Sequence, residues 1–193
     1  MDAMYDLTLP GAGAVQLQPG QRYWLAAPTL AESEVLLDIC AGAAQTRFAG
    51  QVAVLESNGG LLSNLRVWEN LVLPAWYQNI ASLAQLEARF VAALNTLGLH
   101  DADIENVASA LPATLERDRK RMLCVVRAAV LQPGLLLLDQ DMFAYLSRST
   151  LPGIKQLLGE LSARAAVLVI GRGAPDAAWQ LRDLTLNEAD HAL

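Results

Sequence analysis

Four consecutive leucines, Leu135 to Leu138, limit the possible fold of this chain more than any other stretch. The run has no polar alternation, which is typical of a strand buried on both faces in the middle of a parallel sheet. An apolar helical stretch that ends at Gln132-Pro133-Gly134 leads into it, and Asp139 and Gln140 follow it. Ligands in α/β proteins usually bind at the carboxyl ends of such strands, so these two polar residues mark a first candidate site.

Length and composition favour a single domain, residues 1–193, with a sizeable core, because 53% of the residues are hydrophobic. A formal net charge of −6 argues against nucleic acid as a partner, since phosphate contacts need clustered lysine and arginine. The basic cluster between Arg117 and Arg121 is interrupted by Asp118 and is interpreted as a solvated helix face.

The N-terminal residues lack the basic flank and apolar core of a secretion signal, and no apolar run reaches the roughly 18 residues of a membrane span. Cys40 and Cys124 lie in apolar helical stretches without CxxC spacing, which predicts buried thiols in a reducing compartment. The acids of residues 101–105 lack the spacing of a calcium loop and are interpreted as helix N-terminal acids. We therefore expect a cytoplasmic protein with no metal site.

Other buried runs extend the sheet prediction to five strands, with helices on both faces. The predicted strands are Arg22–Ala27, Gln51–Leu55, Leu135–Asp139, Ala166–Ile170 and Leu184–Leu186. Residues 57–110 are predicted to form a mostly helical insert between core segments 1–56 and 111–193. In the first helix of the core, an apolar face of Val35, Leu36, Ile39 and Cys40 is predicted to point inward. For the helix near residues 81–97, Leu83, Leu86, Phe90, Leu94 and Leu97 are predicted to face the core.

Two stretches resemble the ATPase subunits of ABC transporters. The first is a helix with Arg127-Ala128, then Pro133, four apolar residues and Asp139, which matches the region from the signature helix to the Walker B motif. The second matches the segment after the Q-loop at Gly59, Leu61, Leu62, Leu65, Val67, Glu69, Asn70, Leu71 and Pro74. From the residues alone, the second stretch could equally be a Gly-Gly turn and a core helix; with the resemblance, it is nearest to the ATPase of MCE-type lipid-asymmetry transporters.

The resemblance implies a P-loop NTPase-like (ABC ATPase) fold, an α/β architecture with a mainly parallel sheet and a helical insert. Residues 42–50 replace a much longer connection of that family, so the antiparallel subdomain is expected to be reduced.

Residues that would bind nucleotide in that family differ here. Gln140 replaces the catalytic glutamate, Arg172 replaces the switch histidine, and Ser57 replaces the Q-loop glutamine. The phosphate-binding loop has no glycine, with Ser33 at the lysine position and Glu34 at the hydroxyl position. The signature region around residues 111–118 lacks both glycines, and Ser147 replaces the aspartate of the D-loop.

Thr29 and Glu32 instead form a capping-box pattern, in which the Glu32 side chain is expected to bond the backbone N–H of Thr29. Negative charge at this helix start should repel a nucleotide, so MgATP is not expected to bind. The resemblance therefore implies a pseudo-ATPase subunit, peripheral on the cytoplasmic face of the inner membrane. Its expected partners are a membrane permease and either an intact ATPase subunit or a homodimer mate. The alternatives are a weak nucleotide-binding ATPase and a soluble regulatory or scaffold module.

A permease would be received by the segment after the Q-loop, which carries several large apolar residues. The predicted contact residues are Leu61, Leu62, Leu65, Trp68, Trp76 and Tyr77. The alternative is that these side chains belong to the core; exposure of several of them together would favour a protein interface.

Overall fold

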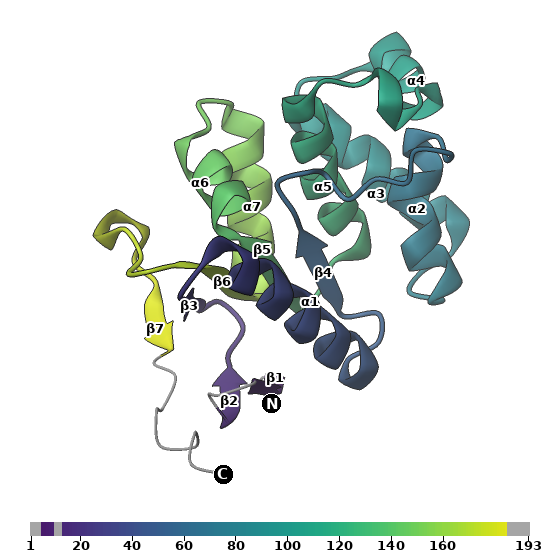
Figure 1. Cartoon of the computed structure of the whole chain (residues 1–193). Coiled ribbons are helices and arrows are strands. Elements are labelled where there is room, and N and C mark those ends of the chain that lie inside the picture. Colours follow the sequence, from purple (N-terminus) through teal and green to yellow (C-terminus); the bar gives the residue numbers. More distant parts are fainter. Residues whose placement is uncertain (1–4, 10–12, 185–193) are drawn as a thin grey trace.

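A computed structural model describes residues 5–9 and 13–184. Its centre is a five-stranded sheet in the order β4-β5-β6-β3-β7, in which every pairing is parallel (Figure 1). The strands are β3 (Arg22–Ala27), β4 (Val52–Leu55), β5 (Leu135–Asp139), β6 (Ala166–Arg172) and β7 (Arg182–Leu184). The predicted mainly parallel sheet is thus confirmed.

β5 lies between β4 and β6, and all four of its leucines are fully buried, as the unbroken apolar run predicted. Strand ends differ from the prediction at three places. β4 begins at Val52 and not at Gln51. β6 continues to Arg172, so the predicted switch position is the last residue of a strand. β7 overlaps the last predicted strand only at Leu184, because residues 185 and 186 lie outside the described part of the chain.

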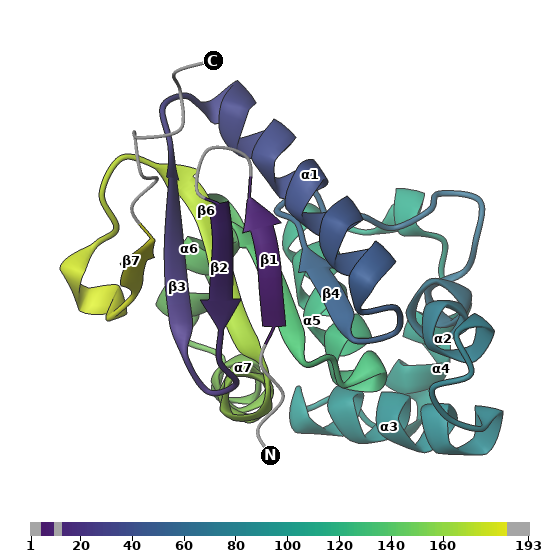
Figure 2. The ribbon, with the colours of Figure 1, turned by 90° about the horizontal axis from the view of Figure 1, so that it is seen from below.

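Helices and a hairpin cover the two faces of this sheet (Figure 2). One face packs against α5 (Arg117–Leu131), α6 (Gln140–Arg148) and α7 (Pro152–Arg164). The other packs against α1 (Leu30–Arg47) and an antiparallel hairpin of β1 (Tyr5–Leu9) and β2 (Gly13–Leu17). The sheet is therefore buried on both faces, although its two covers differ in size.

The predicted inward face of α1 is wrong for Val35 and Ile39, whose exposed fractions are 56% and 42%. Cys40 is buried as predicted, and Leu37 and Ala44 point into the core beside it. The helix is apolar around most of its circumference, so apolar spacing alone could not fix which face turns inward.

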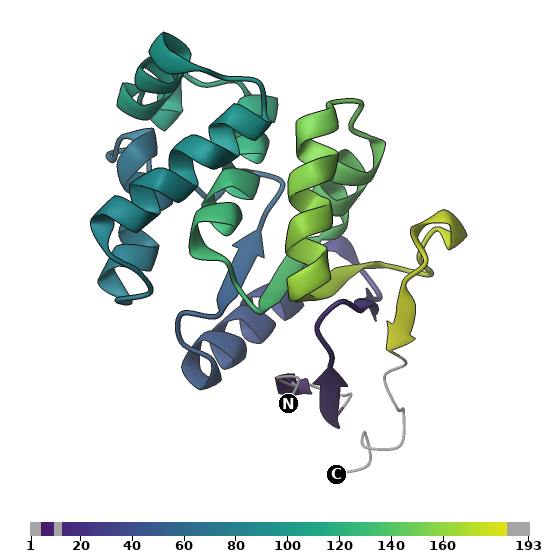
Figure 3. The same ribbon diagram turned by 180° about the vertical axis from the view of Figure 1, so that it is seen from behind.

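Between residues 57 and 110 the chain forms α2 (Val67–Tyr77), α3 (Leu83–Thr96) and α4 (Asp101–Ser109). α2 and α3 pack beside α5, and α4 packs against α2 (Figure 3). In α3 the predicted Leu86, Phe90 and Leu94 are buried, but Leu83 in the first turn is 50% exposed. The acids Asp101 and Asp103 lie in the first turn of α4, as predicted. Within the described residues, none of the helices combines the length and apolar character needed to span a bilayer.

Candidate functional site

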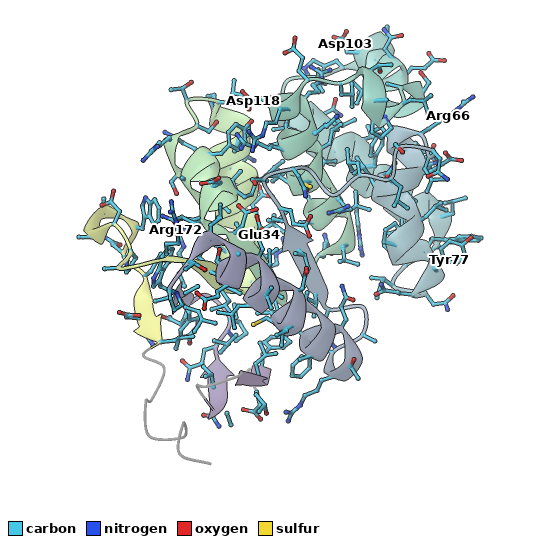
Figure 4. All side chains as sticks on the ribbon, in the orientation of Figure 1. Glu34, Arg66, Tyr77, Asp103, Asp118 and Arg172 are labelled. Atoms are coloured by element: carbon cyan, nitrogen blue, oxygen red, sulfur yellow. The ribbon has the colours of Figure 1, made fainter. Side chains whose placement is uncertain are left out.

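A cleft of about 660 Å³ opens at the carboxyl edge of the sheet. The start of α1, the loop after β4, the junction of β5 with α6 and the end of β6 all contribute to it. Glu34 on α1 and Arg172 at the end of β6 are labelled in Figure 4. The charged side chains that line it are Glu34, Asp38, Glu56, Asp139, Asp141, Arg117 and Arg172. Five carboxylates thus face two guanidinium groups around one cavity.

At the start of α1, side chains of the helix itself form hydrogen bonds with its first turn. Thr29 Oγ1 accepts a hydrogen bond from the backbone N–H of Glu32 at 3.2 Å, and the Thr29 hydroxyl donates to Glu32 Oε2 at 2.8 Å. The predicted pair is therefore present, although Glu32 bonds the Thr29 hydroxyl and not its backbone N–H. Ser33, at the position of the lysine, donates its hydroxyl to the carbonyl of Leu30 at 2.7 Å and is largely buried. No cationic side chain is supplied by these residues.

Asp139 uses both carboxylate oxygens within the protein. Oδ2 accepts the backbone N–H of Ser57 at 2.6 Å, and Oδ1 accepts that of Met142 at 2.6 Å. The second bond makes Asp139 the N-cap of α6, and the first ties the loop after β4 to the end of β5. The Asp139 carboxylate therefore connects the end of β5, the start of α6 and the loop after β4. Because both oxygens already accept hydrogen bonds, the carboxylate has less capacity to hold the water shell of a metal ion.

Gln140 also joins strand ends. Its Oε1 accepts the backbone N–H of Arg172 at 3.0 Å. Next to this bond, a Cβ atom built on Gly171 would collide with the buried Trp24 ring and lie 2.7 Å from Gln140 Cβ. The side chain at the position of the catalytic glutamate is therefore packed against the neighbouring strand.

Three side chains of α5 hold the loop after β4. They are Arg121, whose Nε donates to Ser57 O at 2.9 Å, Cys124, whose Sγ donates to Gly59 O at 2.6 Å, and Arg127, whose Nη1 donates to Gly60 O at 2.7 Å. Both glycines have positive φ, +92° and +48°, and a Cβ on Gly59 would lie 2.8 Å from Lys120 Cβ. The Gly-Gly pair is thus required by conformation and close approach.

Asn70 holds the next segment of the chain and is buried, with 5% exposed. Its Oδ1 accepts the backbone N–H of Leu62 at 2.7 Å, and its Nδ2 lies 3.0 Å from the carbonyl oxygens of Leu62, Leu65 and Arg66. One side chain therefore fixes the path of the chain from the loop into α2.

The signature region and the D-loop position of the resemblance are also described by the structure. Pro112–Thr114 form a short 3₁₀ turn in the signature region, and Arg117 at the start of α5 lines the cleft. Ser147, at the D-loop position, is exposed within α6 and does not line the cleft.

The six predicted permease contacts do not form one patch. Trp68 packs edge-on against Phe90 with ring centroids 5.2 Å apart, and Leu61 also contacts the core. Leu62 is 61% exposed beside Asn70, whereas Trp76 and Tyr77 are 45% and 72% exposed at the far end of α2. Seven residues of helix, about 10 Å, separate Asn70 from Tyr77. Leu65 is half-buried. The exposed residues therefore lie at two separate surface sites, Leu62 at one and Trp76 with Tyr77 at the other.

Sequence reasoning did not assign Asp38, Glu56, Asp141 and Arg117 to the site. Glu56 directly follows β4, so the rule that pointed to Asp139 could have found it. The others come from helices, and only the packing of these helices brings them to the cleft.

No family model matches the chain. Methionine import ATP-binding protein MetN 1 of Pseudomonas fluorescens (strain Pf0-1) is 28% identical over 124 residues, which are 64% of this chain and 35% of that protein. Methionine import ATP-binding protein MetN of Chlamydia pneumoniae is 30% identical over 124 residues, which are also 64% of this chain and 35% of that protein. The chain thus spans about a third of the length of the curated relatives it matches.

Solved structures resemble the chain over more of its length. The structure of an ATP binding subunit of an ABC transporter covers 88% of this chain and has 79% of its own length covered, with a TM-score of 0.67 and 19% identity. The dimeric structure of MJ0796, a bacterial ABC transporter cassette, gives a TM-score of 0.62 and 18% identity over 89% of this chain and 86% of that one. The chain therefore has the ABC ATPase fold, with a mainly parallel five-stranded sheet covered by helices and a small antiparallel sheet.

Proposed function

We propose that this protein is a non-catalytic, ABC-type subunit that associates with a membrane permease in lipid transport of the MCE type. The observation that carries the proposal is the cleft at the carboxyl edge of the sheet, whose lining brings five carboxylates against two arginines. A tetra-anionic nucleotide placed there would meet a negative potential. The lipid class rests on the sequence resemblance of residues 57–79.

MgATP, the cofactor of this fold, does not fit the residues present. The start of α1 offers Ser33 and Glu34 where a lysine and a metal-binding hydroxyl are needed. The N–H of Glu32 is already bonded to Thr29, and both Asp139 oxygens accept backbone N–H groups. Phosphoryl transfer depends on positioning and charge stabilisation, and neither is supplied by these residues.

Restoring the catalytic carboxylate alone is expected to restore no activity. In Gln140→Glu, a carboxylate oxygen can keep the bond to the Arg172 N–H, so the variant should fold like the parent. A general base contributes about 10²–10⁴ in rate, but only to a bound and oriented nucleotide. A phosphate-release assay should stay at background for both proteins. Phosphate release by Gln140→Glu well above the parent would show that a working phosphate site remains.

Permease docking is proposed for the exposed residues at the two ends of α2. Trp76 and Tyr77 lie with ring centroids 5.3 Å apart, and Leu62 projects from the loop that Asn70 holds. Exposed aromatic pairs of this kind are typical anchors of protein interfaces. Docking of a permease would place the protein at the cytoplasmic face of the inner membrane, beside an intact ATPase subunit or a second copy.

Leu62→Asp and Trp76→Asp are each expected to leave the isolated protein folded and to abolish its copurification with a multi-span membrane protein from detergent-solubilised membranes. Both side chains are exposed, Leu62 at 61% and Trp76 at 45%, so the free energy of unfolding should change little, while a buried charge would oppose docking. Leu151→Asp is the matched control, since Leu151 is 52% exposed at the start of α7, away from both ends of α2, and it should copurify normally.

Retention of the membrane partner by both folded variants would place docking elsewhere. Absence of a membrane partner for the parent protein would favour the soluble regulatory alternative.

A further inference from the structure

The outer face of α1 carries an uncharged line along the whole helix. Steps of four, four, three and four residues connect Ala31, Val35, Ile39, Gly42 and Thr46, which places them on one side of the helix. All five are exposed, with Val35 at 56% and Ile39 at 42%. Helices that face only water normally carry charged side chains at their outermost positions, so this line indicates a contact surface.

Nothing in the described part of the chain covers this line. α1 lies on its side of the sheet with only the hairpin of β1 and β2 beside it, and its outer face is open in both views (Figures 1 and 2). The insert that carries Leu62, Trp76 and Tyr77 packs beside α5, which covers the opposite face of the sheet. The α1 surface is thus distinct from the proposed permease surface.

Charges along the helix are arranged unequally about this line. Glu32, Glu34 and Asp38 belong to the first half, and Arg47 is the one basic residue of the helix. Arg47 lies 3.7 Å from Asp6 of the same chain, yet 55% of its side chain remains exposed. An occupant that is basic where α1 is acidic, and acidic where it is basic, would match this surface.

We propose that the occupant is a second copy of this chain, bound through antiparallel packing of the two α1 helices. A two-fold axis between residues 38 and 39 sets Val35 opposite Gly42 and Ala31 opposite Thr46, so that larger side chains meet smaller ones. Glu32 of one copy then lies on the same flank as Arg47 of the other. Such a contact is self-complementary and closed, as expected for a two-fold dimer.

Parallel packing of the same helices is disfavoured by charge. It would set Glu32 beside Glu34 of the other copy at both flanks, leave Arg47 without an acidic partner and align the two helix dipoles. The antiparallel arrangement has one unfavourable feature, because Asp38 of each copy lies near the two-fold axis. The proposal does not depend on the proposed function, although Glu34 and Asp38 also line the cleft.

Sedimentation equilibrium over a concentration series tests the dimer. The parent protein should show concentration-dependent association, and Val35→Arg should raise the dissociation constant at least about tenfold, because the contact would bury an unpaired charge. Asp38→Asn should lower it several-fold by removing like charges at the axis. Tyr77→Arg on the insert, where Tyr77 is 72% exposed, is the matched control and should associate like the parent.

Introduced cysteines test the orientation. A mixture of Val35→Cys and Gly42→Cys chains should form a disulfide-linked heterodimer, and Gly42 has free space for the new side chain. Val35→Cys alone should cross-link poorly, whereas parallel packing would make it cross-link well. The native thiols should not interfere, because burial raises the pKa of Cys40 to about 11 and also raises the pKa of Cys124.

A parent protein that stays monomeric up to roughly 1 mM would overturn the proposal. So would association that Val35→Arg leaves unchanged, or efficient cross-linking of Val35→Cys with itself. Circular dichroism of each variant shows that the change in association does not come from unfolding.

Discussion

Replacing Asn70 with alanine is expected to lower the free energy of unfolding by about 3 kcal/mol. The substitution removes the bond from the Leu62 N–H and the contacts from Nδ2 to the carbonyls of Leu62, Leu65 and Arg66. Each buried partner left unsatisfied costs about 1–3 kcal/mol, reduced here where water can reach the loop. Urea unfolding followed by circular dichroism measures the change.

The control for this substitution is Asn106→Ala in α4. Asn106 is exposed, and none of the described residues bonds its side chain. Its substitution should therefore change the unfolding free energy by less than about 0.5 kcal/mol. Equal effects at the two positions would mean that Asn70 does not hold the loop.

Replacing Gly171 with alanine is expected to destabilise the protein by about 1–3 kcal/mol. The added methyl group would press on the Trp24 ring, which is fully buried, and on Gln140, where Cβ and Oε1 lie 2.7 and 2.8 Å from the new atom. The protein can relieve these close contacts only if the ends of β5 and β6 move apart. Thermal unfolding should show a clear fall in melting temperature.

Gly159→Ala provides the matched control, because in α7 the added methyl group meets no described atom within 4 Å apart from its chain neighbours and the nearby backbone of its own helix. Alanine is favoured over glycine in a helix by about 0.5–1 kcal/mol, so this variant should be slightly stabilised. A Gly171→Ala variant as stable as the parent would show that the packing at this junction is loose.

The sheet could be predicted from the sequence because its strands are nearly uninterrupted apolar runs. Leu135–Leu138 and Ala166–Ile170 are buried on both faces, so almost no other element suits them. The prediction was least accurate for the last strand, β7, in which the charged residues Arg182 and Asp183 pair with β3. Residues 182–184 form a strand because they pair with β3, and the composition of these three residues does not predict that pairing.

The orientation of α1 could not be predicted because apolar residues surround it. Spacing favoured Val35 and Ile39 as core residues together with Cys40, yet Leu37 and Ala44 accompany Cys40 in the core. The same ambiguity hides the uncharged outer line of this helix in the sequence, because only the exposed fractions of its residues distinguish it from the inner face.

At the candidate site, the sequence identified positions but not their bonds. Asp139 was found from its place after β5, whereas its two backbone partners come from residues 57 and 142. Asn70 was noted only as part of a resemblance, and its four contacts depend on the path of a loop that no local pattern encodes. The bond to Ser57 joins Asp139 to a distant segment, whereas the partners of Asn70 lie within eight residues of it.

The most direct measurement of the central claim is isothermal titration of the parent protein with MgATP. With five carboxylates around the cleft and no lysine supplied by the start of α1, we expect no binding heat at millimolar nucleotide and no rise in melting temperature. A saturable isotherm in the millimolar range or tighter, accompanied by thermal stabilisation, would contradict the claim that this cleft has lost its nucleotide site.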